Sequence, residues 1–328
     1  MNATTNRDRL SRLLECLAEQ LGVPPGRYRE ARAHYNAVGN WLAARESNLQ
    51  QFSPRIYPQG SFAIGTAVRP VGAEEFDVEC VCLLETPPSR PPLTQRKLKQ
   101  LVGDRLKHPA SRYRSMIDPP EGGRRCWTIR YAEGSKFHLD VLPAIPASHP
   151  GFLLNRGRRD LSDTAILITD TKTWDDPLAP WPHSDPEGYA EWFKSRMAPT
   201  LENAKQAHAS ASNQHIDDVR DLDVRTPLQQ LVQILKRHRD LRYNGDEDKP
   251  VSIIITTLAA HAYRNESNLK EALTACLPRM RDLIQQRGDE WWVPNPVDFL
   301  ENFADKWRES PRKAEVFLSW IEDLQQEV

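Results

Sequence analysis

Residues 75–84 read EFDVECVCLL, an apolar run that carries two carboxylates at alternate positions. Its density of valine, cysteine and leucine is typical of a strand that is buried on both faces. Side chains at alternate positions of a strand point to one face, so we expect Asp77 and Glu79 to project together, roughly 6 to 7 Å apart. An ionised carboxylate in apolar surroundings is costly unless it is paired or bound to a metal. The stretch therefore predicts a buried strand that carries metal-binding acids.

Two further stretches extend this pattern. Residues 137–143 read FHLDVLP, in which Asp140 is again a lone carboxylate in an apolar strand. Residues 59–70 read QGSFAIGTAVRP, in which Gly60 supplies backbone freedom and Ser61 stands where a short helix is expected to begin. The N–H groups at such a helix start bind phosphate oxygens well. The order of the three stretches predicts a phosphate-binding turn followed by a metal-binding pair of strands.

Each of these features also has a purely structural interpretation. Charged residues in an apolar strand can prevent a sheet edge from pairing with another strand, or can pair with a basic side chain. Either role would account for Asp77 and Glu79. Asp140 could cap a turn near Pro143, and Ser61 alone would be an ordinary helix N-cap. It is the conjunction of the three that favours a catalytic site.

The segments around these stretches predict an α+β fold. Apolar residues recur at helical spacing in residues 8–21 and 26–46, and Gly22, Pro24 and Pro25 interrupt the run between them. A helix is expected at residues 94–107. Three strand-like runs follow, at residues 112–117, 125–132 and 136–145. Helices followed by a run of strands indicate an α+β sheet domain.

The second half of the sequence is expected to be helical. Residues 143–186 are rich in Pro, Asp and Trp and contain one strand-like run, at 165–170. Beyond them, apolar stripes at helical spacing predict helices at residues 186–197, 226–243, 251–265, 268–288, 297–309 and 313–326. We therefore expect two domains, residues 1–165 with the N-terminal helices and the sheet, and residues 166–328 with the helical lobe.

Composition narrows the classes of function. The 328 residues include 44 Lys and Arg against 45 Asp and Glu, a formal charge of −1, which argues against a chain-wide grip on nucleic acid. No long apolar segment is present, so a cytoplasmic protein is expected. The five cysteines follow no zinc or disulfide pattern and are expected to be reduced, with Cys80 and Cys82 as buried thiols.

Together, QGSFAIGTAVRP, EFDVECVCLL and FHLDVLP resemble the nucleotidyltransferase core of the bacterial cGAS/DncV-like nucleotidyltransferases, also called SMODS domains. Residues 184–193, 231–240, 249–263 and 293–307 resemble other segments of that family and, more distantly, of oligoadenylate synthetases. The resemblance implies a bilobed, polymerase-beta-like core with a mixed twisted sheet, and a helical C-terminal lobe that closes the nucleotide pocket. The implied activity is synthesis of a cyclic di- or trinucleotide from NTPs, with release of pyrophosphate, in anti-phage (CBASS) signalling.

The resemblance also implies roles for eight residues. Three acids of the family bind two Mg²⁺ ions, for which Mn²⁺ is a possible substitute, and they match Asp77, Glu79 and Asp140. Phosphate-binding residues match Gln59, Gly60, Ser61, Lys236 and Ser252. The second acid is usually Asp in the family, so Glu79 is a departure that puts the site geometry and the level of activity in question. Lys236 stands in a basic run that would otherwise be interpreted as a solvated helix face.

The implied mechanism is a two-metal displacement at the α-phosphorus, with Asp140 orienting or deprotonating the attacking hydroxyl. The implied partners are NTPs, with ATP among them, a product-sensing effector protein and accessory regulators. No stable DNA binding, no membrane contact and a monomer are expected. Two alternatives stay open: a nucleotidyltransferase that modifies a tRNA, protein or small-molecule acceptor, and an inactive module that only binds nucleotide.

Overall fold

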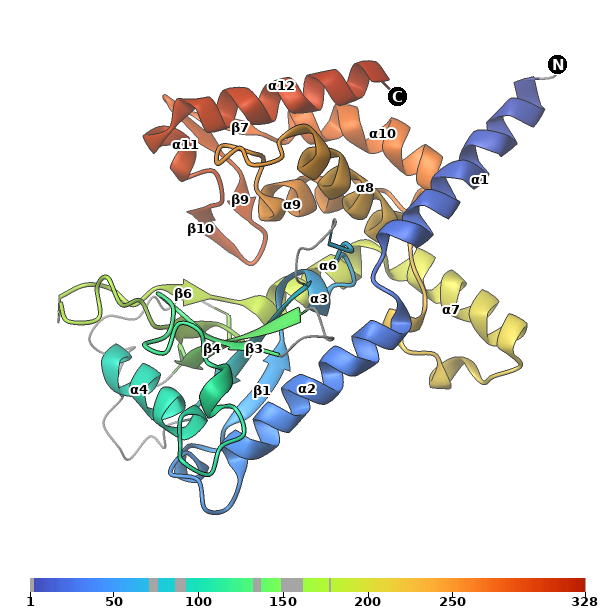
Figure 1. Ribbon diagram of the computed structural model, residues 1–328. Coiled ribbons are helices and arrows are strands. Elements are labelled where there is room, and N and C mark those ends of the chain that lie inside the picture. Colours follow the sequence, from blue (N-terminus) through green and yellow to red (C-terminus); the bar gives the residue numbers. More distant parts are fainter. Residues whose placement is uncertain are drawn as a thin grey trace. The chain divides into compact units, whose positions relative to one another are not determined.

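The computed structural model describes residues 3–70, 76–85, 93–131, 137–148, 162–176 and 178–327. Its contacts divide the chain into two compact units. The sheet unit comprises Gly26–Ala63 and Pro70–Ala190, and the helical unit comprises Met1–Pro25, Ile64–Arg69 and Glu191–Val328. Figure 1 shows the elements of both units. Among the described residues, no helix combines the length and the apolar character needed to cross a membrane.

The sheet unit is built on a six-stranded mixed sheet. Its strands run in the order β1 (Arg55–Pro58), β2 (Phe76–Leu83), β4 (Phe137–Pro146), β5 (Ile166–Ile168) and β6 (His183–Ser184), and β3 (Trp127–Arg130) also pairs with β4. β2 and β4 are parallel, whereas the other pairs are antiparallel. The predicted α+β class with a mixed sheet is confirmed.

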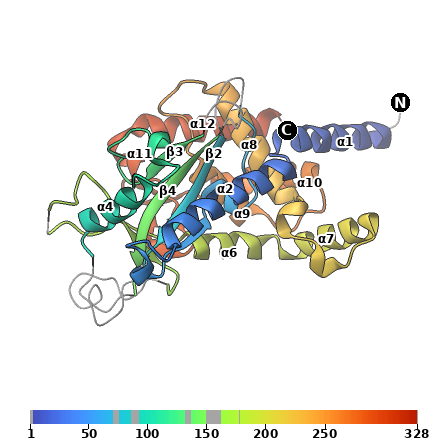
Figure 2. The same ribbon diagram turned by 60° about the horizontal axis from the view of Figure 1, so that its bottom comes forward.

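Two helices cover one face of this sheet, α2 (Pro25–Ala43) and α4 (Gln95–Leu106) (Figure 2). Gly39 of α2 packs so closely on Ile56 of β1 that a Cβ atom built on the glycine would lie 2.2 Å from the isoleucine side chain. Gly103 of α4 approaches the ring of Trp127 in β3 in the same way. Cys80 and Cys82 face these helices as fully buried free thiols, as predicted.

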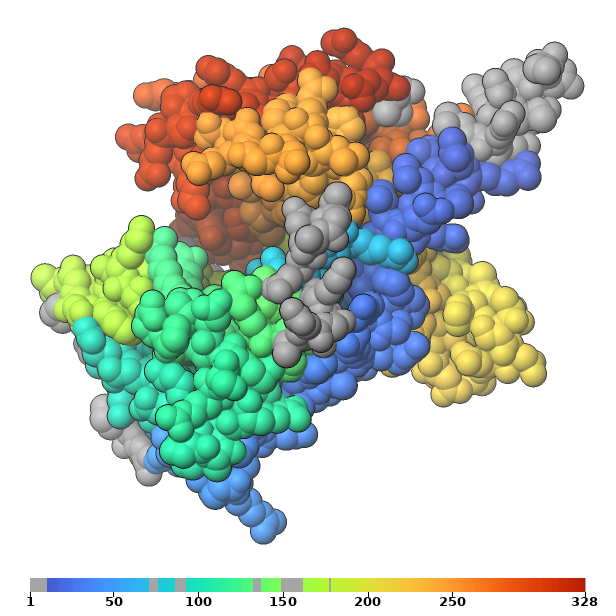
Figure 3. Space-filling model, viewed as in Figure 1, coloured from blue at the N-terminus to red at the C-terminus, as the bar shows by residue number. Residues whose placement is uncertain are grey.

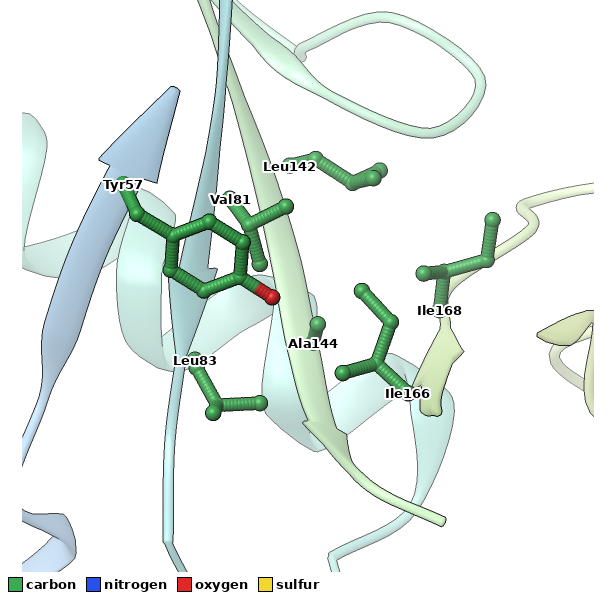
Figure 4. Packing of buried hydrophobic residues seen from close by; sticks show 7 residues of the cluster. All are labelled: Tyr57, Val81, Leu83, Leu142, Ala144, Ile166 and Ile168. Carbon is green, nitrogen blue, oxygen red and sulfur yellow. The ribbon is translucent and has the colours of Figure 1, made fainter. Parts of the chain in front are cut away.

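The opposite face of the sheet holds an apolar cluster at one end. Its seven buried residues project from β1, β2, β4 and β5 toward one another (Figure 4) and are Tyr57, Val81, Leu83, Leu142, Ala144, Ile166 and Ile168. The strand register pairs Val81 with Leu142 and Leu83 with Ala144. The cluster therefore fills one half of the face to which the odd-numbered residues of β2 point.

The helical unit gathers helices from both ends of the sequence. The first helix, α1 (Ala3–Leu21), packs on α8 (Pro227–Arg242) and α10 (Leu269–Asp282). The other long helices are α7 (Ala198–Ser212), α9 (Ser252–Ala262) and α12 (Pro311–Glu327), while α6 (Pro186–Arg196) runs across the boundary of the units. α7 buries only Leu201 and Ala209, and its yellow surface lies open in Figure 3. Thr226 caps α8 in a capping box with Gln229, which confirms the predicted start.

Polar side chains of α8 hold the backbone of Ile64–Arg69 in the helical unit. Gln229 Nε2 donates to the carbonyl oxygen of Ile64 at 3.0 Å, and Gln233 Nε2 donates to that of Ala67 at 2.9 Å. Both glutamine side chains are buried. Gly65, with φ +70°, lies directly against the Gln229 amide, where a Cβ atom would be 2.4 Å from Nε2. This short segment is therefore fixed to α8 by its main-chain carbonyls.

Two sequence-based assignments are wrong, both where short polar side chains bond to the backbone. Residues 112–117, expected as a strand, contain the 3₁₀ turn Arg114–Met116, and the Ser111 hydroxyl accepts from the Tyr113 N–H. Residues 297–309, expected as a helix, form β9 (Pro294–Asn295), β10 (Asp298–Asn302) and the short α11 (Lys306–Glu309). There the Asn302 side chain accepts from the N–H groups of Val293 and Ala304.

Two further elements differ from the expected helices. α10 ends at Asp282, so the tail of the helix expected at 268–288 forms β7 (Gln285–Arg287), which pairs with β8 (Glu290–Trp292). Gly288 between these strands has φ +63°, a conformation that glycine adopts readily. α7 lies in the half of the chain that was expected to be helical, but it was not among the helices placed individually.

Candidate active site

The three predicted acids lie on one face of the sheet. In the parallel pairing of β2 with β4, Asp77 is opposite His138 and Glu79 is opposite Asp140. Because side chains alternate along each strand, all four project from the face that carries the apolar cluster. β2 lies between β1 and β4, but β1 pairs only with residues 80–83 of β2, beyond the two acids. The carboxylates of β2 thus lie where this strand extends past β1.

Asp77 and Asp140 each contact a side chain on a strand of the sheet. Asp77 is well exposed, at 66% of its side-chain surface, and its Oδ1 lies 3.0 Å from His138 Nε2. Asp140 is half-buried, and its Oδ1 accepts a hydrogen bond of 2.5 Å from the Thr128 hydroxyl on β3. Thr128 and His138 were not singled out in the sequence, because cross-strand register decides which residues face an acid.

A glycine turn adjoins the second acid. The N–H of Gln59 donates to the Glu79 carbonyl at 2.9 Å, which places the start of α3 (Gly60–Ala63) beside β2. Gly60 has φ +62°, and a Cβ atom built on it would lie 2.2 Å from Glu79 Oε2. Only glycine allows this close approach without a shift of the carboxylate. Ser61 follows as a half-buried residue of α3.

The donor set of this face fits a hard divalent cation. Asp77, Glu79 and Asp140 offer carboxylate oxygens, the ligands that Mg²⁺ and Mn²⁺ prefer. Three carboxylates on paired strands repel one another, and a bound cation would offset that repulsion. The longer side chain of Glu79 reaches the Gly60 turn, so its carboxylate stays on the same side as the other two acids. The residues present are therefore compatible with divalent metal ions.

The two remaining candidates, Lys236 and Ser252, belong to the helical unit. Lys236 on α8 is only 6% exposed, and its Nζ donates to the carbonyl oxygen and hydroxyl of Thr66 at 3.3 and 3.2 Å. A solvated helix face is therefore the wrong interpretation of this lysine. Ser252 begins α9, and its hydroxyl accepts from Arg239 Nη1 at 3.2 Å. Arg239 lies one turn beyond Lys236 on α8.

The structure thus brings six of the eight candidates together within the sheet unit and places the other two close to one helix of the helical unit. The six are Gln59, Gly60, Ser61, Asp77, Glu79 and Asp140. They combine a glycine turn of positive φ with three carboxylates on one sheet face. Such an arrangement can bind a polyanion through metal ions and place a carboxylate beside a reacting hydroxyl.

Comparison with known proteins agrees with this arrangement. Residues 54–143 match the family model described as cyclic GMP-AMP synthase DncV-like, nucleotidyltransferase domain. The matched segment contains all six candidates of the sheet unit.

Two curated proteins match over most of their length. A c-di-GMP synthase of Roseivirga ehrenbergii is 30% identical over 335 residues, covering 100% of this chain and 81% of that protein. The cyclic dinucleotide synthase CdnG of Bradyrhizobium diazoefficiens is 27% identical over 322 residues, covering 92% of this chain and 71% of that protein.

A solved structure shares the fold. The Bradyrhizobium diazoefficiens CD-NTase CdnG in complex with GTP aligns with a TM-score of 0.71 at 22% identity, over 97% of this chain and 91% of that chain. The similarity therefore extends beyond the sheet to nearly all of the sequence.

Proposed function

The chain belongs to the cyclic GMP-AMP synthase DncV-like nucleotidyltransferases, and on that basis we propose that it joins two nucleoside triphosphates into a cyclic dinucleotide. In each of two steps a ribose hydroxyl attacks an α-phosphorus. A new O–P bond forms, the bond to pyrophosphate breaks, and the hydroxyl proton is released. Two triphosphates thus give one ring and two pyrophosphates. The observation that carries the proposal is the strand register that sets Glu79 opposite Asp140, with Asp77 two residues away.

Asp77, Glu79 and Asp140 are proposed to hold two Mg²⁺ ions, with Mn²⁺ as a possible substitute. When bound, such ions lower the pKa of an attacking hydroxyl and neutralise charge on the leaving pyrophosphate. The acids themselves orient the reacting groups. Asp140, fixed by Thr128, is proposed to accept the proton of the hydroxyl that attacks. Removal of divalent ions with EDTA is expected to abolish product formation, and added Mg²⁺ is expected to restore it.

The glycine turn is proposed to bind the triphosphate. Gly60 and Ser61 offer backbone N–H groups and a hydroxyl beside Glu79, Gln59 precedes them with its side-chain amide, and the absence of a side chain at Gly60 lets phosphate oxygens approach the backbone. We also propose that Lys236 and Ser252 contact the phosphates, as the resemblance implies. Their contribution is testable by the KM for nucleotide in Lys236→Ala and Ser252→Ala variants.

GTP is the substrate we propose first, because a relative that is 30% identical is a c-di-GMP synthase. The product would then be a cyclic dinucleotide of two guanosines. The expectation from the sequence that ATP is among the substrates stays a prediction. Both are settled by which single nucleotide or pair of nucleotides supports product formation.

The deciding experiment uses the purified full chain with each NTP alone and with all pairs, in Mg²⁺ or Mn²⁺. Products are identified by mass spectrometry and by nuclease digestion, and pyrophosphate release is measured in parallel. A cyclic product from GTP alone is the expected result. Pyrophosphate release that requires an added tRNA, protein or small-molecule acceptor would instead identify an acceptor-modifying enzyme. Nucleotide binding with no turnover would identify a binding module.

The biological role proposed from the resemblance is anti-phage (CBASS) signalling, in which a separate effector protein binds the product. Plaque assays in cells that carry the effector with either the wild-type chain or an Asp77→Ala/Glu79→Ala variant test this role. Protection by the wild-type chain alone is expected, whereas equal plaque numbers would contradict the role. The proposed monomer is testable by light scattering during gel filtration.

A further inference from the structure

We propose that Thr128 is a positioning residue that holds the Asp140 carboxylate in the orientation needed for catalysis. The proposal rests on the proposed function of Asp140 and adds a residue from a third strand to the site. It is carried by the contact between the two side chains, whose hydroxyl and carboxylate oxygens are 2.5 Å apart. This distance is at the short end for an O–H···O⁻ hydrogen bond, the class of bond to which charge adds strength.

Strand pairing brings these two residues together. β3 and β4 are antiparallel, and their register sets Thr128 directly opposite Asp140. Directly opposed residues project to the same face of a sheet, so the hydroxyl meets the carboxylate without any bend of the backbone. Thr128 is half-buried, as Asp140 is, so water competes only in part for this bond.

The neighbouring residue, Trp127, fixes where Thr128 can be. Its ring is 4% exposed and lies on the opposite face of the sheet, against Gly103 of α4 and Gly122. Its indole Nε1 donates to the Lys99 carbonyl at 3.0 Å. Since a Cβ atom on either glycine would come within 3 Å of the ring, the tryptophan has little room to move. β3 is therefore held in one register, and Thr128 cannot slide away from Asp140.

A buried lysine fixes the chain just before β3. Lys99 is 1% exposed, and its Nζ donates to the carbonyl oxygens of Gly123 and Cys126, at 2.5 and 3.3 Å. Its pKa is lowered to about 8, chiefly by burial. These carbonyls stabilise the ammonium group and in turn are held by it. The support for Thr128 thus reaches from α4 through the turn to β3.

The consequence for the site is a fixed Asp140. A carboxylate without a partner rotates about its terminal bond, which has broad and roughly two-fold preferences. A hydroxyl donor on one oxygen selects one of these orientations. Groups that orient metal ligands in this way typically change metal affinity or activity by about 10–100-fold when removed.

The test compares Thr128→Val, which keeps the shape and removes the hydroxyl, with Thr128→Ser, which keeps the hydroxyl. We expect Thr128→Val to lower kcat by about 10–100-fold while the KM for GTP changes by less than about threefold. We expect Thr128→Ser to stay within about threefold of wild type. Mn²⁺ affinity of the nucleotide-free protein, measured by electron paramagnetic resonance, is expected to weaken in the valine variant and recover in the serine variant.

Thr169→Val is the matched control. Thr169 is a fully buried threonine of the sheet unit, and its hydroxyl donates to the Arg125 carbonyl at 3.1 Å, so it supports the chain just before β3 through a backbone carbonyl. Its kcat and Mn²⁺ affinity are expected to stay near wild type. If Thr128→Val does not show a cooperative thermal transition, Thr128→Ala replaces it.

The proposal is overturned if Thr128→Val keeps wild-type kcat and Mn²⁺ affinity, if Thr128→Ser is as impaired as Thr128→Val, or if Thr169→Val shows the same losses. A wild-type protein that forms no cyclic product would overturn the proposed function. The Mn²⁺ measurement would then still decide whether Thr128 positions Asp140.

Discussion

The two ends of one sheet face differ in what they are built to do. At one end β2 and β4 present Asp77, Glu79 and Asp140, and at the other the same strands present Val81 and Leu142, in continuous register. The parallel pairing of β2 with β4 is the same at both ends, so this pairing alone does not make a site. The apolar end buries its side chains and contributes stability. The acidic end gathers like charges, which costs stability when no cation is bound.

The largest effect is expected from breaking the acidic end. Asp77→Ala/Glu79→Ala should lower kcat by about 1,000-fold or more, because metal ions at such a site contribute several kcal/mol to the barrier. Stability should stay equal or rise, since like charges are removed from one face. Product formation and thermal unfolding are the two measurements. Near wild-type turnover would remove these acids from the mechanism.

The reverse result is expected at the apolar end. Ile166 is 1% exposed within the apolar cluster, so Ile166→Ala should lower the free energy of unfolding by about 2–5 kcal/mol. At a temperature where the variant is folded, kcat should change by less than about threefold. Urea denaturation gives the stability and steady-state kinetics give kcat. A large fall in kcat with little loss of stability would mean that the two ends are not separable.

A smaller effect is expected where the glycine turn meets the acids. Gly60→Ala puts a residue with a side chain into the left-handed backbone conformation, which costs about 1–2 kcal/mol of stability. It also places a Cβ atom against Glu79 Oε2. A loss in kcat/KM of about tenfold or more should follow. Glu79→Asp withdraws the carboxylate by one methylene, so in that background Gly60→Ala should cost less. Steady-state kinetics of both single variants and the double variant measure this coupling.

Gly245→Ala is the control for the turn. Gly245 has φ +78°, but nothing lies within 4 Å of a Cβ atom built on it. The variant therefore reports the cost of the backbone conformation alone, measured as a change in unfolding free energy. Strictly additive losses for Gly60→Ala and Glu79→Asp would show that the close approach to Glu79 has no functional effect.

The smallest effect is expected on the helix-covered face of the same strands. Burial raises the pKa of Cys82 to about 12 and raises that of Cys80 well above its usual range. A thiol stays protonated below its pKa, so both should resist a disulfide reagent at pH 8. Exposed Cys16 should react fast, with activity unchanged. More than one fast equivalent per chain, or a loss of activity on labelling, would contradict this.

The parts that the sequence predicts well are those in which local pattern and burial agree. β2 and β4 were expected from dense apolar runs, and the lone carboxylates in them marked the acidic end of the face. β10 was mistaken for a helix because its apolar spacing is ambiguous over a few residues, while Asn302 and Asp298 bond to nearby backbone instead. The spacing of apolar residues in the sequence does not reveal such bonds between side chains and backbone.

Contacts that depend on register were beyond prediction. Thr128 faces Asp140 only because β3 pairs with β4 in one alignment out of several, and a shift by one residue would turn its hydroxyl to the other face. The burial of Lys236 likewise depends on the short segment that contains Thr66, about 170 positions earlier in the chain. Tertiary pairing, rather than composition, decides both.

The chain passes back and forth between its two units, so neither unit is one continuous segment of the sequence. It passes from one to the other at residues 25/26, 63/64, 69/70 and 190/191. A recombinant fragment that starts near residue 166 would lack α1 and the carbonyl oxygens of Ile64 and Ala67, which leaves the amides of Gln229 and Gln233 with no acceptor there. A fragment truncated at this position should therefore aggregate. Loops within a unit are the positions at which this enzyme is expected to tolerate a break in the chain.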